Sequence, residues 1–243
     1  AILLATGGLI ALIALGETRR KNDNDREAAE NLRIHQQSTL DQQKDQFEKQ
    51  LEKQQEQFDA NAFKERKAER RERYTKAVEQ LGDEKAPIRM GGVYTLVGLV
   101  DEWLEEENLS ESERRKEGQI IINNLCAYIR SPFPLVSEYR RLAGSAHTDP
   151  QAHLKMQQIR DELSPEARVR ERILAEVSAR VSRLGAAGDG PASGPWSWLV
   201  FDFSGAVFFY PVLLTASYCT GEMAFRDCIF LEEARFSHAY FAQ

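Results

Sequence analysis

The chain has 243 residues, of which 29% are charged, and its formal net charge is −6 at pH 7. This length allows one or two domains, and the slightly acidic balance argues against nucleic acid or another polyanion as a partner. Its three cysteines, Cys126, Cys219 and Cys228, form no CxxC pair. The sequence therefore indicates reduced thiols and neither a zinc site nor a disulfide framework.

The first sixteen residues, AILLATGGLIALIALG, carry no charge. About 20 apolar residues span the core of a bilayer, so we expect a clipped transmembrane helix over residues 1–16, with the lipid bilayer as its partner. A secretory signal is disfavoured because no small-x-small cleavage site follows. Arg19, Arg20 and Lys21 come next, and basic residues beside a span stay on the cytoplasmic side. The predicted location is the cell membrane, single-pass or multi-pass, with the residues after 21 in the cytoplasm.

Residues 17–72 form a predicted polar stalk. From Asp25 to Leu81 the sequence lacks Pro and Gly and is rich in Gln, Glu, Lys and Arg, which predicts one long helix. Its sparse apolar residues recur at steps of 7, 4, 7 and 4, at Leu40, Phe47, Leu51, Phe58 and Ala62. An eleven-residue period is typical of a nearly straight or gently right-handed coiled coil. A homo-oligomer and a solvated single helix both stay open, because Gln36, Gln43 and Gln54 weaken the apolar face.

A basic run, KERKAERRERYTK, occupies residues 64–76 and has seven Lys or Arg against three Glu. Such a run can touch nucleic acid or lipid headgroups. The interleaved Glu residues favour a solvated helix face instead, and no nucleic-acid partner is expected.

Residues 73–184 form a predicted helical domain of four to six helices around one core. Two of its helices meet at a turn with LGD and Pro87, and their apolar stripes contain Val78, Leu81, Val93, Leu96, Val97 and Val100. This helix, LGD turn and second helix resemble a HEAT-type repeat. Further helices are expected over residues 119–130 and 167–184. His147 and His153 lie near Asp149, but a third ligand is missing, so no metal is expected.

We find no GxSxG, GxxxxGKS or HExxH motif and no paired carboxylates in a catalytic context. The sequence therefore predicts no catalytic residue and no cofactor, and the chain is not expected to be an enzyme.

A Gly- and Ala-rich linker, residues 185–195, precedes a region of different composition, residues 196–243. Eight triplets follow one another there at alternating steps of five and six residues, namely FDF, AVF, VLL, SYC, MAF, CIF, ARF and AYF, from Phe201 to Phe241. A fixed eleven-residue period of this kind predicts a repeat architecture.

These triplets resemble the pentapeptide-repeat family, whose consensus is roughly A(D/N)LxX. The resemblance implies a right-handed quadrilateral β-helix, a solenoid of which residues 196–243 form the start only. RYTKAVEQLG, IRMGGVYTLVGL and NLCAYIRSPF extend the likeness to actinobacterial membrane-anchored pentapeptide-repeat proteins with a helical middle domain. The expected class is α + β. The implied repeat core comprises Phe203, Ala206, Phe208, Val212, Leu214, Ser217, Phe225, Cys228, Phe230, Ala234, Phe236, Ala239 and Phe241.

Three functions are weighed. The leading hypothesis is a membrane-anchored, non-enzymatic scaffold or protein–protein interaction module for an unknown protein partner, because solenoids offer long faces without a pocket. The alternative, taken from quinolone-resistance relatives, is a DNA mimic that regulates a DNA-binding enzyme such as gyrase. Residues 196–243 contain five acidic and two basic residues, which suits mimicry without requiring it. A third hypothesis is an enzyme whose active site lies in missing terminal residues or in the helical domain.

Overall fold

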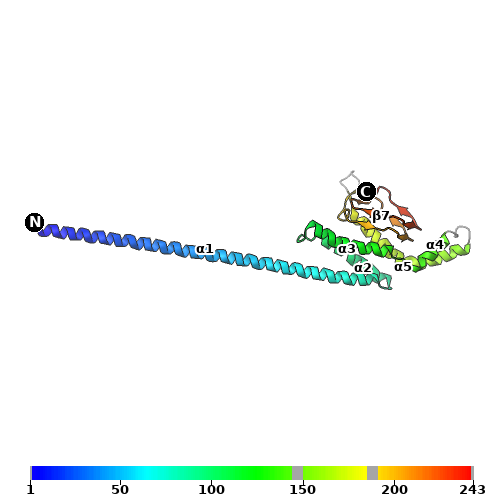
Figure 1. Ribbon diagram of the computed structural model, residues 1–243, viewed down its shortest axis with the longest axis horizontal. Helices are drawn as coiled ribbons and strands as arrows, with labels where there is room; N and C mark the ends of the chain where they lie inside the picture. Colours follow the sequence, from blue (N-terminus) through cyan, green and yellow to red (C-terminus); the bar gives the residue numbers. More distant parts are fainter. Residues whose placement is uncertain (1, 144–149, 185–190, 242–243) are drawn as a thin grey trace. The chain divides into compact units, whose positions relative to one another are not determined.

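The computed structural model describes residues 2–143, 150–184 and 191–241. Within these ranges five helices, α1–α5, are followed by ten short strands, β1–β10 (Figure 1). The chain divides into two compact units, Ala1–Glu65 and Arg66–Gln243. The helical domain and the strands that follow it therefore belong to one unit.

The first unit is a single helix. It is formed by α1 (Ile2–Leu81), which continues into the second unit and contains the helix expected from Asp25 to Leu81. Every side chain from residue 15 to residue 61 is exposed. The side-chain pairs join residues four positions apart, as when Gln37 donates to Asp41 at 3.3 Å. In a single chain, this stretch of helix is stabilised by the backbone hydrogen bonds of α1 and by these local side-chain pairs.

The predicted transmembrane helix over residues 1–16, and the membrane location inferred from it, are wrong. None of the helices in the described residues is sufficiently long and apolar to cross a bilayer. The uncharged stretch ends at Gly16, and Glu17 continues α1 with charged residues directly behind it.

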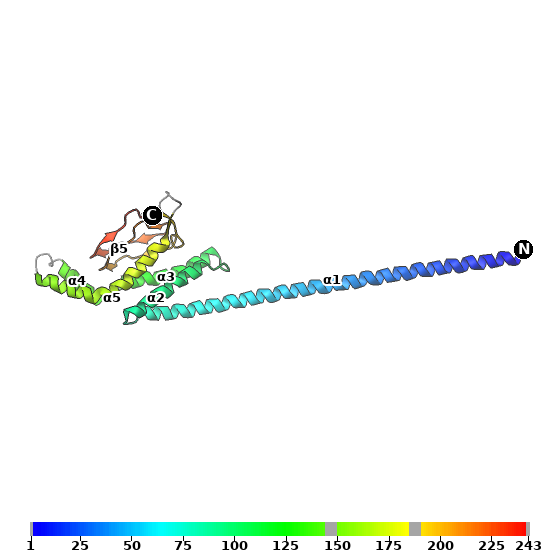
Figure 2. The same ribbon diagram turned by 180° about the vertical axis from the view of Figure 1, so that it is seen from behind.

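The second unit begins with the last turns of α1. Four helices follow: α2 (Ala86–Leu104), α3 (Glu111–Arg130), α4 (Pro134–Ala143) and α5 (Pro150–Val181). Helix α2 packs against both α3 and α5, and α4 packs against α5 (Figure 2). The start of α3 is fixed by a capping box, in which Ser110 and Glu113 exchange hydrogen bonds between side chain and backbone.

The helical core contains most of the residues expected from the apolar stripes. Leu81, Val93, Leu96, Val97 and Val100 are all buried. Val78 is the exception: it is 38% exposed, and its neighbour Ala77 is buried instead. The close approach of α2 to α1 explains this, because a Cβ atom at Gly92 would lie 2.7 Å from the Ala77 carbonyl oxygen.

The strands begin with an antiparallel pair, β1 (Ser182–Leu184) and β2 (Pro191–Ser193), so residues 191–193 of the predicted linker pair with the end of the helical region. The others are β3 (Phe201–Asp202), β4 (Val207–Phe208), β5 (Val212–Leu213), β6 (Tyr218–Cys219), β7 (Met223–Ala224), β8 (Ile229–Phe230), β9 (Ala234–Arg235) and β10 (Tyr240–Phe241). Each of the eight predicted triplets holds one of these strands. Phe201 lies opposite Met223 and Tyr218 opposite Tyr240, so paired strands are 22 residues apart.

Two kinds of link explain the alternating steps of five and six. Links of two residues contain a residue with positive φ, and these residues recur every eleven positions at Gly205, Ala216, Asp227 and His238. Links of three residues, 209–211, 220–222 and 231–233, contain no such residue. The eleven-residue period therefore records one tight turn and one wider turn.

The predicted right-handed quadrilateral β-helix is wrong. In the described part of the chain β3 pairs with β7, β4 with β8, β5 with β9, and β6 with β10, as four separate two-stranded parallel sheets. Each strand pairs with one other strand, so these strands do not join into a closed or solenoid sheet. The structure is 69% helical. The predicted fold class, a transmembrane helix and stalk with a HEAT-like domain and a β-helix, is therefore wrong in this form.

Candidate functional site

The predicted repeat-core residues form two rows with different burial. Phe203, Ala206, Phe208, Val212, Leu214 and Ser217 are fully buried. In the second row Phe225, Cys228, Phe236, Ala239 and Phe241 are half-buried, and Phe230 and Ala234 are exposed. The rows meet through their rings, with centroids 5.3 Å apart for Phe203 and Phe225 and 4.9 Å apart for Phe208 and Phe230. These side chains pack against one another and leave no polar group for a ligand.

The helices cover the first row and fix its position. Helix α3 packs against β3, and α5 packs against β5. Gln119 of α3 donates to the Val200 carbonyl at 2.7 Å and accepts from the Val200 N–H at 2.9 Å. The side-chain amide thus satisfies both backbone groups of Val200, as a neighbouring strand would. Asp101 of α2 accepts from the Trp196 indole at 2.8 Å. The difference in burial between the rows thus follows from this helical cover.

The acidic residues of the strand region are mostly paired with arginine. Asp202 binds Arg130 at 2.7 Å, and Glu222 binds Arg226 at 3.3 Å. Glu232 contacts Arg160, and Glu233 contacts Arg235 at 2.5 Å. A DNA mimic needs rows of free carboxylates, so these four residues offer no support for that alternative.

The thiols and histidines show no reactive arrangement. Burial raises the pKa of Cys126 to about 12 and that of Cys219 to about 11, and it also raises the pKa of Cys228. These thiols stay protonated at neutral pH and are poor nucleophiles. Of the residues noted for a metal, His153 contacts Gln157, whereas His147 and Asp149 lie outside the described residues. No three potential ligands gather to hold a metal ion in the described ranges.

A buried ion cluster centred on Glu166 joins three helices. Glu166 of α5 accepts from Arg170 at 2.7 Å and from the Tyr128 hydroxyl of α3 at 2.9 Å, and it lies 3.1 Å from Arg89 of α2. Arg170 also donates to the Ile129 carbonyl at 2.8 Å. Burial, with the Glu166 carboxylate, raises the pKa of Tyr128, so its hydroxyl stays a donor. The cluster holds the three helices in place, although the Nε atom of Arg89 is buried without a hydrogen-bond partner in the described part of the chain.

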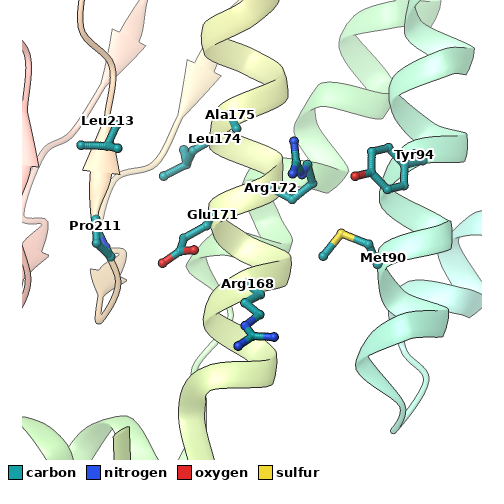
Figure 3. A pocket seen from close by; sticks show the side chains of 9 residues that line it. All are labelled: Met90, Tyr94, Arg168, Glu171, Arg172, Leu174, Ala175, Pro211 and Leu213. Carbon is teal, nitrogen blue, oxygen red and sulfur yellow. The ribbon is translucent and has the colours of Figure 1, made fainter. Parts of the chain in front are cut away.

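A cavity of about 460 Å³ with charged side chains in its lining lies between α2, α5 and β5. We call it the α5 surface, and it is lined by Met90, Tyr94, Arg168, Glu171, Arg172, Leu174, Ala175, Pro211 and Leu213. Figure 3 shows Glu171 and Leu174 pointing from α5 toward Pro211 and Leu213, with Arg172 on the side of Tyr94. The cavity thus has a wall from α2, a floor from α5 and a wall from the strand region.

The sequence of α5 explains why its outer face is polar. Its buried residues recur at steps of three and four and include Ile159, Leu163, Glu166, Val169, Ile173 and Val177. Arg168, Glu171 and Arg172 fall between them and therefore face outward. On the walls Tyr94 and Leu213 are 49% and 50% exposed, so apolar surface is open to solvent there.

The charges of the α5 surface are only partly paired. Arg172 lies 3.6 Å from Glu176 and covers the ring of Tyr94, 5.8 Å from its centroid. Arg168 makes neither a hydrogen bond nor an ion pair with any described residue. Burial raises the pKa of Glu171, and Arg168 partly opposes that shift. A guanidinium and a half-buried carboxyl are therefore both available to a ligand.

Two further cavities continue this site along α5. One of about 420 Å³ shares Met90 and Arg168 and reaches Pro165. Because Pro165 has no N–H, it cannot donate a helical hydrogen bond to the carbonyl of Asp161, which also lines this cavity. Another of about 310 Å³ shares Glu171 and Pro211 and reaches Tyr139. Together they make a shallow site along both sides of one helix, which suits an extended or helical segment better than a small molecule.

Sequence reasoning missed the α5 surface. The predicted helix over residues 167–184 contains Arg168 and Arg172, but charged residues on a helix are a signal shared with most solvated helices. Met90, Tyr94 and Leu213 come from distant segments, and no spacing in the sequence connects them with α5.

The chain shows no match to any family model, to curated proteins or to solved structures. The resemblance to the pentapeptide-repeat family therefore stays a prediction from the triplets.

Proposed function

We propose that this chain is a non-enzymatic scaffold whose α5 surface holds a segment of a partner protein. The observation that carries the proposal is Arg168, a guanidinium without a hydrogen bond or ion pair to the described residues, which lines the same cavity as the half-exposed side chains of Tyr94 and Leu213. Aromatic and arginine side chains in such surroundings contribute most of the binding free energy at protein interfaces.

The chemistry of the site defines the partner segment. An apolar side chain that inserts beside Met90 and Leu213 removes apolar area from water, which contributes about 25 cal/mol per Å² before the cost of association. A carboxylate one turn away pairs with Arg168, and a donor meets Glu171. The proposed partner segment therefore combines an apolar anchor with an adjacent acidic residue.

The test is site-specific photo-crosslinking with the full chain in cells that make it. A photoreactive phenylalanine replaces Leu213, and a matched control replaces Leu154, which is 59% exposed on α5 and lines none of these cavities. We expect one recurrent protein adduct from position 213 and none from 154. Arg168→Glu should reduce that adduct about tenfold, because it reverses the charge offered to the acidic residue.

The tryptophan fluorescence of Arg168→Glu should match that of the unaltered chain, which separates lost binding from lost folding. Equal adducts from positions 213 and 154, or an adduct that Arg168→Glu leaves unchanged, contradict the proposal.

A further inference from the structure

The first unit carries an apolar row for which a single chain has no cover. Leu32, Leu40, Phe47, Leu51 and Phe58 of α1 are each 57–68% exposed. They belong to a series with steps of three, four and four residues that we call the seam, namely Ala29, Leu32, Gln36, Leu40, Gln43, Phe47, Leu51, Gln54, Phe58 and Ala62. These steps keep ten residues on one face of a helix over three eleven-residue periods.

The two flanks of the seam differ in charge. The residues that directly follow seam positions include Glu30, Asp41, Glu48, Glu52 and Asp59, with Arg33 and Lys44 as the basic members. The residues that directly precede seam positions are Ala28, Asn31, His35, Thr39, Gln42, Gln46, Gln50, Lys53, Gln57 and Asn61. One flank is therefore acidic, and the other is rich in uncharged amides.

This asymmetry distinguishes the two ways in which two copies can pair. In a parallel pair the two-fold axis runs along the helices, so the acidic flank of one copy meets the amide flank of the other. In an antiparallel pair the acidic flanks of the two copies meet each other, and so do the two amide flanks. The antiparallel register that matches Leu40 with Phe58 and Phe47 with Leu51 also sets Asp41 beside Asp59 and Glu48 beside Glu52. Like charges at these positions oppose that arrangement.

We infer that residues 29–62 pair with a second copy of this chain as a parallel, in-register, two-stranded coiled coil. Each Phe and Leu of the seam then meets its own counterpart. Gln43 and Gln54 meet the same residues of the second copy, where the amides can hydrogen-bond across the seam and fix the register. The inference goes beyond the proposed function: it provides two α5 surfaces in one assembly, which raises avidity for a partner with repeated segments.

The first test is the mass of the full chain in solution by light scattering. The monomer has a mass of 27.7 kDa, and we expect twice that value. Leu51→Glu should raise the dissociation constant at least about tenfold, because it places a charge within the seam. Ala60→Glu adds the same charge on the opposite face of α1 and should leave the dimer intact. A monomeric or trimeric unaltered chain at about 100 µM, or equal effects of both substitutions, would overturn the inference.

The second test reports orientation. Gln43→Cys should form a disulfide-linked dimer under mild oxidation, and Gln54→Cys should do the same eleven residues further along. In the antiparallel register residue 43 faces residue 55, so the two cysteines lie about 18 Å apart, beyond the roughly 7 Å that a disulfide bridges. Asp45→Cys, on the opposite face, and the unaltered chain, in which Cys126 and Cys219 are buried, serve as controls. No linkage through positions 43 and 54, or equal linkage through 45, would overturn the parallel pair.

Discussion

The two units use similar side chains in different ways. In the first unit Lys44 pairs with Glu48, one helical turn away, and Leu51 is 57% exposed. In the second unit Asp101 accepts from Arg180 and Trp196, residues 79 and 95 positions along the chain, and Leu99 is fully buried. Local pairs stabilise a helix by only a few tenths of a kcal/mol each, whereas long-range contacts make unfolding cooperative. We therefore expect the second unit to unfold as one body, and residues 15–61 of a monomeric chain, such as the Leu51→Glu variant at low concentration, to lose helix gradually.

The tryptophans allow this contrast to be measured. All three, Trp103, Trp196 and Trp198, belong to the second unit. Tryptophan fluorescence therefore follows the second unit alone, while circular dichroism at helix wavelengths follows both units. A mutation in the second unit should move the fluorescence transition and leave the gradual helical phase unchanged.

The largest expected effect is at the buried ion cluster. Glu166→Gln removes the negative charge that Arg170 and Arg89 share. The charge is lost from a buried site, because Glu166 and Arg170 are only 4% and 2% exposed. Removing one partner of a buried ion pair costs about 3–5 kcal/mol of unfolding free energy. Urea unfolding followed by tryptophan fluorescence should show this loss.

Glu171→Gln is the matched control, because it makes the same substitution one and a half turns away on α5. Burial raises the pKa of Glu171, and no hydrogen bond or ion pair to a described residue depends on its charge. We expect a change within about 0.5 kcal/mol. Equal losses for the two variants would show that the Glu166 cluster has no special weight.

The next effect is at Gly221, where the backbone passes close to residues 197–199, the segment just before β3. The amides of Thr220 and Gly221 both donate to the Ser197 carbonyl at 2.7 Å, and a Cβ atom at Gly221 would lie 2.3 Å from the Leu199 carbonyl oxygen. Gly221→Ala should therefore cost about 3 kcal/mol in the fluorescence transition. Gly98→Ala in α2 meets nothing within 4 Å and should stabilise the same transition by up to about 1 kcal/mol.

A smaller effect concerns pH. Hydrogen bonding from Ser204 lowers the pKa of Asp202, and the nearby Arg130 lowers it further. A lowered pKa in the folded state gives stability that is complete above the ordinary Asp pKa of about 3.9 and disappears as the pH falls through the folded value. Because Asp202 is 45% exposed, solvent screening limits the contribution to less than about 1 kcal/mol. The gap in unfolding free energy between the unaltered chain and Asp202→Asn should narrow from about pH 7 to about pH 3. A constant gap would contradict this.

The smallest effect is a gain. Ala216 has a φ of 53°, a left-handed conformation that costs an L-residue about 1–2 kcal/mol. Ala216→Gly relieves that strain and adds chain entropy to the unfolded state, so we expect a net gain of about 0.5 kcal/mol. Ala175→Gly, on the exposed face of α5, should instead cost up to about 1 kcal/mol. Thermal unfolding followed by fluorescence distinguishes the two signs.

The sequence by itself determined the features that depend on near neighbours. The absence of Pro and Gly between Asp25 and Leu81 predicted a helix, and α1 contains it. The alternating triplets marked the position of all eight parallel strands, because the links between them are set by local backbone geometry. The transmembrane helix was predicted from the apolar stretch of residues 1–16, but α1 continues from that stretch directly into charged residues, and none of the helices in the described ranges can cross a bilayer.

The tertiary structure alone decided which apolar residues are covered and which polar ones are left free. Phe208 and Phe230 occupy equivalent places in their triplets, yet Phe208 is fully buried and Phe230 is 37% exposed, because helices cover only the first row. The expected β-helix assumed that regular spacing implies a continuous sheet, but two-residue strands form only separate pairs. The α5 surface joins Met90 and Tyr94 to Leu213 across more than a hundred residues. Periodicity describes one element at a time, and a site made by packing several elements exists only once they have met.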